Sequence, residues 1–161
     1  TPNLFNDQYS NVIHDNDRQV KAFIEWIQAQ PFYENTTVVI VGDHLTMDSD
    51  FFDKDDPNYQ RTVYNAFLNT TQTASRVTDR QATALDLFPT TLAALNVTIE
   101  GERLGLGTNL FSAKPTLAEE LGFDSFYTEL TKRSTFYAEK LMQGTDDEIY
   151  KQREAEKEAE E

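Results

Sequence analysis

A run of β-branched residues from Thr36 to Val41 constrains the fold of this chain more than any other feature. The run carries no charged residue, which indicates a strand buried on both faces, as in a parallel sheet. It follows an amphipathic helix predicted from Tyr9 to Gln30 and ended by Pro31. The apolar face predicted for that helix consists of Val12, Ile13, Val20, Phe23, Ile24 and Ile27. A helix followed by a buried strand is typical of α/β folds.

The sequence after this strand predicts a further strand and a further helix. Residues 48–58 are acidic and polar and predict a surface loop, and a second strand is expected from Val63 to Leu68. A helix is expected from Asp86 to Leu95, capped by Asp86, with Pro89 in the first turn, where a missing N–H group costs little. From Gly101 to Gly107 three glycines interrupt any regular element, and turn geometry is sufficient to explain them.

The C-terminal part predicts two helices and a charged tail. The segment Thr116–Glu119 has a capping-box pattern that opens a short helix, and Gly122 is placed to end it. A last helix is expected from Ser125 to Gln143. Its predicted buried residues are Phe126, Leu130, Tyr137 and Leu141. We therefore predict one domain over residues 1–144 and a charged tail, helical or disordered, over residues 145–161.

Composition excludes several functions for this chain of 161 residues. Its formal net charge is −14 and no basic patch is present, so we expect no binding of nucleic acid. Cysteine is absent, which excludes disulfides, thiolate metal sites and a cysteine nucleophile. No apolar run approaches the roughly 20 residues that span a bilayer. The 161 residues are therefore expected to fold as a soluble acidic domain.

Asp43 and His44 are the strongest candidates for chemistry. They follow the predicted buried strand and Gly42 directly, and ligands of open α/β sheets bind beyond the carboxyl ends of strands. A carboxylate oxygen and an imidazole nitrogen suit Mn²⁺, Mg²⁺ or Zn²⁺, and Gly42 lets the backbone bend so that both side chains can reach one ion. The alternative is a turn capped by Asp43 beside a surface histidine. The residue pattern leaves both interpretations open.

Other residues favour structural or solvent-facing roles. His14 falls on the polar side of the first helix, where a solvent-facing position is favoured over metal binding. The acidic loop fails the EF-hand pattern, because Asp53 and Tyr59 stand where glycine and glutamate are required. A Gly-X-Ser-X-Gly elbow is absent, and the chain offers no evident nucleophile. The sequence therefore contains part of a metal site without the group that would attack a substrate.

Three segments of the chain resemble one enzyme family. The segment from Tyr9 to Thr36 leads into Gly42-Asp43-His44, a step shared by sulfatases, phosphodiesterases and phosphatases. The segment Leu85–Leu95 is similar to the Asp-hydrophobic-aromatic-Pro-Thr helix of the alkaline phosphatase superfamily. The segment Ile99–Phe111 resembles the phosphoglycerol transferases, relatives of lipoteichoic acid synthase that decorate membrane-derived oligosaccharides or cell-wall polysaccharides.

This resemblance implies a fold and a metal site. The expected fold is an α/β, alkaline-phosphatase-like sandwich of helices around a mostly parallel sheet, of which this chain would be only the C-terminal portion. The family uses a threonine nucleophile and a divalent cation, usually Mn²⁺, with Mg²⁺ or Zn²⁺ as alternatives. Asp43 and His44 would be two of the metal ligands. None of the 42 residues before Asp43 resembles the nucleophile motif, so the threonine and an acidic ligand are expected upstream, and this chain alone is expected to be inactive.

The implied reaction takes place at the cell membrane. It moves glycerol phosphate from phosphatidylglycerol to a glycan or polyol acceptor through a glycerophospho-threonine intermediate. The resemblance also implies membrane helices upstream and an extracytoplasmic position for this portion, whose open strand edges are expected to favour self-association. Two alternatives remain, namely a sulfatase or phosphodiesterase of the same superfamily and a non-catalytic acidic binding domain.

Overall fold

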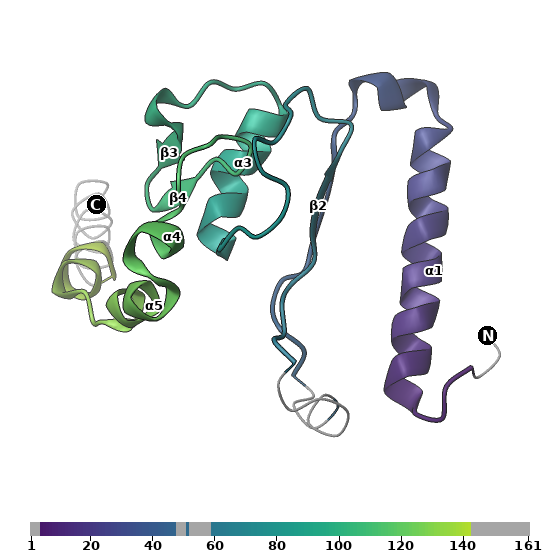
Figure 1. Cartoon of the computed structure of the whole chain (residues 1–161), viewed down its shortest axis with the longest axis horizontal. Helices are drawn as coiled ribbons and strands as arrows, with labels where there is room; N and C mark the ends of the chain where they lie inside the picture. The colour runs from purple at the N-terminus through teal and green to yellow at the C-terminus, as the bar shows by residue number, and fades with distance from the viewer. Residues whose placement is uncertain (1–3, 48–50, 52–58, 143–161) are drawn as a thin grey trace, which may run out of the picture. The chain divides into compact units, whose positions relative to one another are not determined.

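The computed structural model describes residues 4–47, 51 and 59–142. The chain divides into two compact units, a first unit over residues 1–114 and a second unit over residues 115–161 (Figure 1). The predicted charged tail and most of the predicted acidic loop lie outside the described residues. None of the helices described is long and apolar enough to cross a lipid bilayer.

The first unit opens with helix α1, Gln8–Gln28, close to the range that its apolar periodicity predicts. The Asp7 carboxylate caps α1 by accepting a hydrogen bond of 2.7 Å from the Ser10 backbone N–H, and this bond lowers the pKa of Asp7. A short 3₁₀ helix, Pro31–Asn35, follows. Of the six residues predicted for the apolar face of α1, Ile27 is buried and the others are exposed or half-buried. Within the part of the chain described, this face is therefore largely uncovered.

Strands β1 (Val38–Val41) and β2 (Asn65–Leu68) pair antiparallel, whereas the β-branched run predicts a strand of a parallel sheet. Val38 lies opposite Leu68, and Val41 lies opposite Asn65. Positions along β1 alternate between half-buried and exposed, so this strand is not buried on both faces here. The described residues form a mixture of helices and short strands and do not show the predicted sandwich around a parallel sheet.

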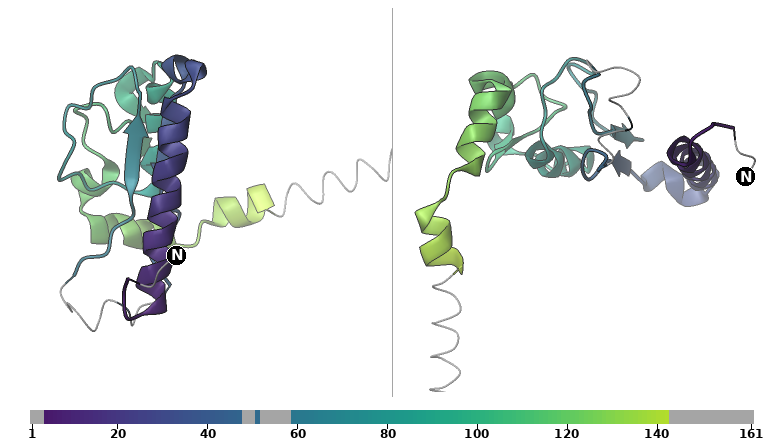
Figure 2. Two further views of the ribbon diagram at one scale, coloured as in Figure 1. Left: turned by 90° about the vertical axis from the view of Figure 1, so that its right-hand side faces the viewer. Right: turned by 90° about the horizontal axis from the view of Figure 1, so that it is seen from below.

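The β1–β2 ribbon stands between α1 and helix α3, Leu87–Ala94, in the first unit (Figure 1 and Figure 2). Asn69 ends β2 with a positive φ of 55°. Its side-chain amide donates to the carbonyls of Tyr33 (2.6 Å) and Thr36 (2.9 Å). These two bonds tie the end of the ribbon to the 3₁₀ helix that precedes β1.

A 3₁₀ turn, Ala84–Asp86, precedes α3 and contains a buried carboxylate. Asp86 is 2% exposed and occupies the N-cap position of α3 as predicted, but its side chain makes no capping bond to that helix. Its carboxylate instead accepts hydrogen bonds from the backbone N–H groups of Thr83 (2.8 Å) and Thr108 (2.7 Å). A buried carboxylate requires such donors because its desolvation is costly. Asp86 therefore joins the turn before α3 to the segment that contains Thr108.

A 3₁₀ turn, Glu100–Glu102, leads into an antiparallel hairpin of strands β3 (Arg103–Leu104) and β4 (Gly107–Thr108), where the sequence predicts only irregular turns. Positive φ angles of 68° at Gly101 and 60° at Gly105 account for two of the three glycines. Gly107 has a different role, because its Cα lies against the backbone of the turn before α3. Gly101 and Gly105 therefore allow the turns of this hairpin, and Gly107 allows its close packing against the turn before α3.

Gly107→Ala is expected to destabilise the first unit strongly. A Cβ at this position would lie 1.9 Å from the Leu85 carbonyl oxygen, which is a backbone atom and cannot rotate away. We expect the free energy of unfolding to fall by about 3 kcal/mol or more, measured by urea denaturation. Gly105→Ala is the control, because a Cβ there meets no atom within 4 Å and only the positive φ is strained. Equal stability of the two variants would contradict the prediction.

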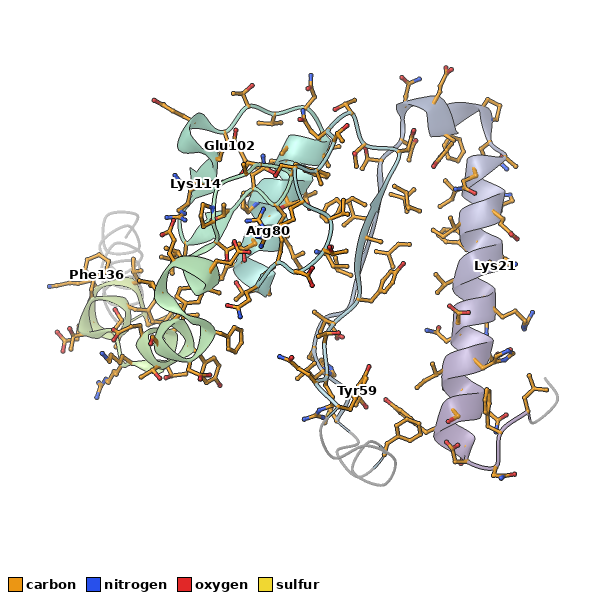
Figure 3. The ribbon with its side chains drawn as sticks, in the orientation of Figure 1. Lys21, Tyr59, Arg80, Glu102, Lys114 and Phe136 are labelled. Carbon is orange, nitrogen blue, oxygen red and sulfur yellow. The ribbon has the colours of Figure 1, made fainter. Side chains whose placement is uncertain are left out.

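The Arg80 side chain holds the segment that follows β4. Its guanidinium donates to the carbonyl oxygens of Leu110 (3.1 Å), Ser112 (2.9 Å) and Lys114 (2.7 Å). Figure 3 shows Arg80 and Lys114 in this region of the first unit. The ring of Phe111 in the same segment packs edge-on against Phe67 of β2, with centroids 5.6 Å apart. The segment is thus fixed to the rest of the unit from two sides.

The second unit begins with helix α4, Leu117–Leu121, and the predicted capping box is confirmed. The Thr116 hydroxyl accepts from the Glu119 backbone N–H (3.1 Å), and the Glu119 carboxylate accepts from the Thr116 backbone N–H (2.8 Å). Gly122, with φ 81°, separates α4 from helix α5, Phe123–Thr131. Both the start and the end of this short helix are therefore as the sequence predicts.

The single last helix predicted from Ser125 to Gln143 is wrong. α5 ends at Thr131, Lys132 is extended, and a separate π-helical segment, Tyr137–Met142, follows. The Ser134 hydroxyl accepts a hydrogen bond of 3.1 Å from the Tyr137 backbone N–H, which starts a new helical turn instead of continuing the old one. Among the predicted buried residues Phe126 is buried, whereas the exposed ones are Leu130, Tyr137 and Leu141.

Candidate metal centre

Asp43 and His44 lie where the β1–β2 ribbon opens. Gly42 still belongs to the ribbon, because its backbone N–H donates to the Tyr64 carbonyl at 2.8 Å. A Cβ on Gly42 would lie only 3.3 Å from the Cβ of Val63, so a larger residue would push the two sides of the ribbon apart. The next two side chains leave the ribbon, and Asp43 and His44 are 87% and 60% exposed. The position at the end of a strand agrees with the sequence prediction.

Hydrogen bonds to the local backbone turn the two side chains toward each other. Asp43 Oδ1 accepts from the His44 backbone N–H at 2.9 Å. His44 Nδ1 lies 2.7 Å from the Leu45 carbonyl oxygen, and because a carbonyl only accepts, Nδ1 carries the proton. Nε2 of the same ring lies 3.5 Å from Asp43 Oδ2, and it offers a lone pair to a metal when it carries no proton.

This arrangement fits a divalent cation. Histidines that bind metals commonly donate their other ring N–H to a carbonyl or carboxylate, as Nδ1 does here. Two ligand atoms about 2.1 Å from one tetrahedral ion lie roughly 3.4 Å apart, close to the 3.5 Å between Nε2 and Oδ2. Oxygen and imidazole nitrogen together suit Mn²⁺, Mg²⁺ and Zn²⁺. The donor chemistry of the pair therefore suits a divalent cation, and its spacing suits two ligands of a tetrahedral ion.

Two ligands do not complete a metal site. Across residues 4–47, 51 and 59–142, no group of three or more His, Asp or Glu side chains could hold an ion together. His14 is half-buried on α1, where its ring packs edge-on against Phe5 with centroids 5.9 Å apart. Asp53 of the predicted acidic loop lies outside the described residues. The assignment of Asp43 and His44 as metal ligands therefore stays a prediction.

Tyr9 at the start of α1 fixes the segment that follows His44. Its hydroxyl forms a short hydrogen bond with the Thr46 hydroxyl, and its ring packs against Phe51 with centroids 4.8 Å apart. From the sequence, Tyr9 is predicted only as the start of a helix and of a family-like segment. Its spacing of 37 residues from Thr46 carries no local signal that would reveal this contact.

Arg61, which precedes β2, contacts the same segment from the other side of the ribbon. Its Nη1 donates to the Thr46 carbonyl oxygen at 3.2 Å. Arg61 lies three residues before Tyr64, whose carbonyl accepts from the Gly42 backbone N–H. No local sequence pattern predicts a role for Arg61, since its contact with Thr46 spans 15 residues.

A protein-family model described as Sulfatase matches residues 5–97. The match spans more than half of the chain and contains α1, the β1–β2 ribbon, the Asp43–His44 pair and α3. The chain belongs to the sulfatase family. Membership places this sulfatase-family chain among the hydrolases and transferases of the alkaline phosphatase superfamily, which confirms the resemblance at that level. Searches of curated proteins and of solved structures found no match.

The extent of the sulfatase match separates two parts of the prediction. It includes Asp43 and His44, and enzymes of the sulfatase superfamily typically use a divalent metal. It ends at Val97, before the segment Ile99–Phe111 whose resemblance points to phosphoglycerol transferases. The match therefore identifies the sulfatase family, and it does not extend to the segment that resembles the transferase branch.

Proposed function

We propose that this sulfatase-family chain supplies two metal ligands, Asp43 and His44, to a metal-dependent phosphoglycerol transferase. The observation that carries the proposal is the geometry of the pair. Nδ1 of His44 is committed to the Leu45 carbonyl, and Nε2 lies 3.5 Å from the second oxygen of Asp43. The proposed cation is Mn²⁺, with Mg²⁺ or Zn²⁺ as alternatives. The threonine nucleophile and an acidic ligand would come from sequence outside these 161 residues.

The residues of the pair have different tasks in this proposal. Asp43 contributes the negative charge that holds a cation, and His44 contributes a neutral nitrogen that binds only when it is deprotonated. When bound, a divalent cation supplies positive charge that favours an ionised nucleophile and screens a phosphodiester. Both side chains are exposed, so a lipid headgroup can reach them from solvent. Tyr9 and Arg61 hold the adjoining backbone at Thr46.

The proposed donor is phosphatidylglycerol, and the proposed acceptor is a glycan or polyol of the cell envelope. Support comes from the segment Ile99–Phe111, which resembles the transferase branch and forms the β3–β4 hairpin with its glycine-dependent turns. The reaction would take place on the extracytoplasmic side of the cell membrane. The alkaline-phosphatase-like sandwich would be completed by segments outside this sequence.

A transfer assay on the full-length protein tests the proposal. Vesicles of phosphatidylglycerol labelled in the headgroup glycerol are incubated with Mn²⁺, with and without a glucan or polyol acceptor. We expect label to move to the acceptor while an equal amount of diacylglycerol forms, and we expect chelation of the metal to stop both. The sulfatase match favours a hydrolase as the second candidate, and label released as free glycerol phosphate regardless of acceptor would assign it. Absence of metal-dependent diacylglycerol release would overturn the proposal.

A further inference from the structure

We infer that Arg61 binds the phosphate group of the donor lipid. The inference rests on the proposed function and adds a residue that recognises its substrate. Arg61 lies in the segment that leads into β2. Its Nη1 donates to the carbonyl of Thr46, two residues beyond His44. Arg61 lies three residues before Tyr64, whose carbonyl accepts a hydrogen bond from the Gly42 backbone N–H. A guanidinium is therefore held against the segment that follows the metal-ligand pair.

The bond to Thr46 leaves most of the Arg61 guanidinium available. A guanidinium has five N–H donors, and the Thr46 carbonyl takes one of them. Among residues 4–47, 51 and 59–142, Arg61 makes no other hydrogen bond or ion pair, and it is exposed. The remaining donors form the planar fork that pairs with two oxygens of one phosphate. One edge of the side chain thus anchors it, and the other is able to bind a ligand.

The positive charge of Arg61 matters for phosphate binding because the rest of the chain is strongly acidic. The chain carries a net charge of −14, which repels an anionic phosphodiester, and Asp43 adds negative charge at the site itself. Among the described side chains that hydrogen-bond to the segment from Asp43 to Thr46, Arg61 is the one with a positive charge. A phosphate that approaches the pair would therefore be attracted by Arg61 together with the bound metal.

In a purely structural role, Arg61 would only hold the backbone at Thr46 and would not bind phosphate. Loss of the side chain would then loosen the segment after His44 and weaken metal binding. Two variants separate this role from phosphate binding. Arg61→Gln keeps an N–H donor for the carbonyl but removes the charge, and Arg61→Lys keeps the charge but loses the fork.

The experiment uses the full-length protein with Mn²⁺. Calorimetry measures the affinities for inorganic phosphate and for Mn²⁺, and vesicles of phosphatidylglycerol give kcat and KM. For Arg61→Gln we expect phosphate affinity to fall about tenfold and KM to rise by a similar factor, because one charge-assisted contact is lost in ground state and transition state alike. Its kcat and Mn²⁺ affinity should stay within about twofold of the unsubstituted protein. Arg61→Lys is expected to recover part of the phosphate affinity.

Lys21→Gln is the matched control. It removes the same charge from the middle of α1, where Lys21 pairs with Glu25 at 3.7 Å (Figure 3). Phosphate affinity and KM should not change in this variant. An equal effect of Lys21→Gln would show that only the net charge matters and would overturn the inference.

Three further outcomes would also overturn it. These are an unchanged phosphate affinity in Arg61→Gln, a loss of Mn²⁺ affinity as large as the loss of phosphate affinity, and a loss of phosphate affinity without a rise in KM for the lipid. In each case the proposed function stands as long as the unsubstituted protein transfers glycerol phosphate. If the unsubstituted protein releases no diacylglycerol, the proposed function fails, and so does the assignment of the lipid headgroup to Arg61.

Discussion

His44→Ala in the full-length protein is expected to abolish metal-dependent turnover. The substitution removes Nε2, the proposed ligand atom 3.5 Å from Asp43 Oδ2, so the cation loses a ligand and not merely a neighbour. Loss of an outer partner of a metal ligand typically costs 10–100-fold in affinity or activity, and we expect loss of the ligand itself to exceed about 100-fold in kcat/KM. The measurement is diacylglycerol release from phosphatidylglycerol at saturating Mn²⁺.

His14→Ala provides the matched control, since His14 is the other of the two histidines and lies on α1 against Phe5. Its turnover should stay close to that of the unsubstituted protein. Asp43→Asn keeps the shape of the side chain and an acceptor for the His44 N–H but removes the charge, so we expect a loss comparable to that of His44→Ala. Near-normal turnover of His44→Ala at saturating Mn²⁺ would show that His44 is not a ligand.

The second large effect is expected for Asp86→Ala, which should lower the free energy of unfolding by about 3 kcal/mol or more. The substitution leaves the backbone N–H groups of Thr83 and Thr108 without their carboxylate acceptor. It also leaves a cavity at a position that is 2% exposed. Asp86→Asn fills the same volume and retains one acceptor oxygen, so its loss should be about half as large. Urea denaturation measures both variants.

Asp17→Ala tests whether the effect of Asp86 is specific to its buried position. Asp17 lies exposed on α1, and replacing an exposed carboxylate usually changes stability by about 0.5 kcal/mol or less. If Asp86→Ala were no less stable than Asp17→Ala, the hydrogen bonds of Asp86 would not contribute to holding the unit together.

The elements predicted correctly are those with signals inside one or two turns of chain. The apolar spacing before Pro31 gives α1, and the Thr116–Glu119 capping box gives α4, because both patterns act over three or four residues. Gly122 ends α4 for the equally local reason that it adopts a positive φ. Such features depend little on what the element packs against.

The features missed depend on partners far away in the chain. The apolar run of β1 indicates a strand, but its antiparallel partner begins at Asn65 and no local pattern selects it. Burial along α1 and α5 likewise depends on neighbouring surfaces, so periodicity predicts which face is apolar and not whether that face is covered. The break after Thr131 was not predicted, because no glycine or proline marks the extended Lys132 that ends the helix.

The candidate site shows the same division. The position of Asp43 and His44 at a strand end follows from the β-branched run and Gly42. The proton on Nδ1 of His44 cannot be predicted from the sequence, because it depends on the direction of the Leu45 carbonyl. The place of Arg61 depends on a contact with Thr46, 15 residues earlier in the chain. Sequence therefore located the two candidate ligands, and the structure was needed to orient them.

The three carbonyl bonds of Arg80 make the end of the first unit tolerant of some mutations and intolerant of others. A carbonyl is common to all twenty amino acids, so the side chains at Leu110 and Lys114 can drift among relatives without loosening these bonds. A change at position 80 would release all three carbonyls together. Inserting or deleting a single residue between positions 110 and 114 would shift at least one carbonyl out of reach. Evolution is therefore expected to preserve the arginine and the spacing of this stretch while its composition varies.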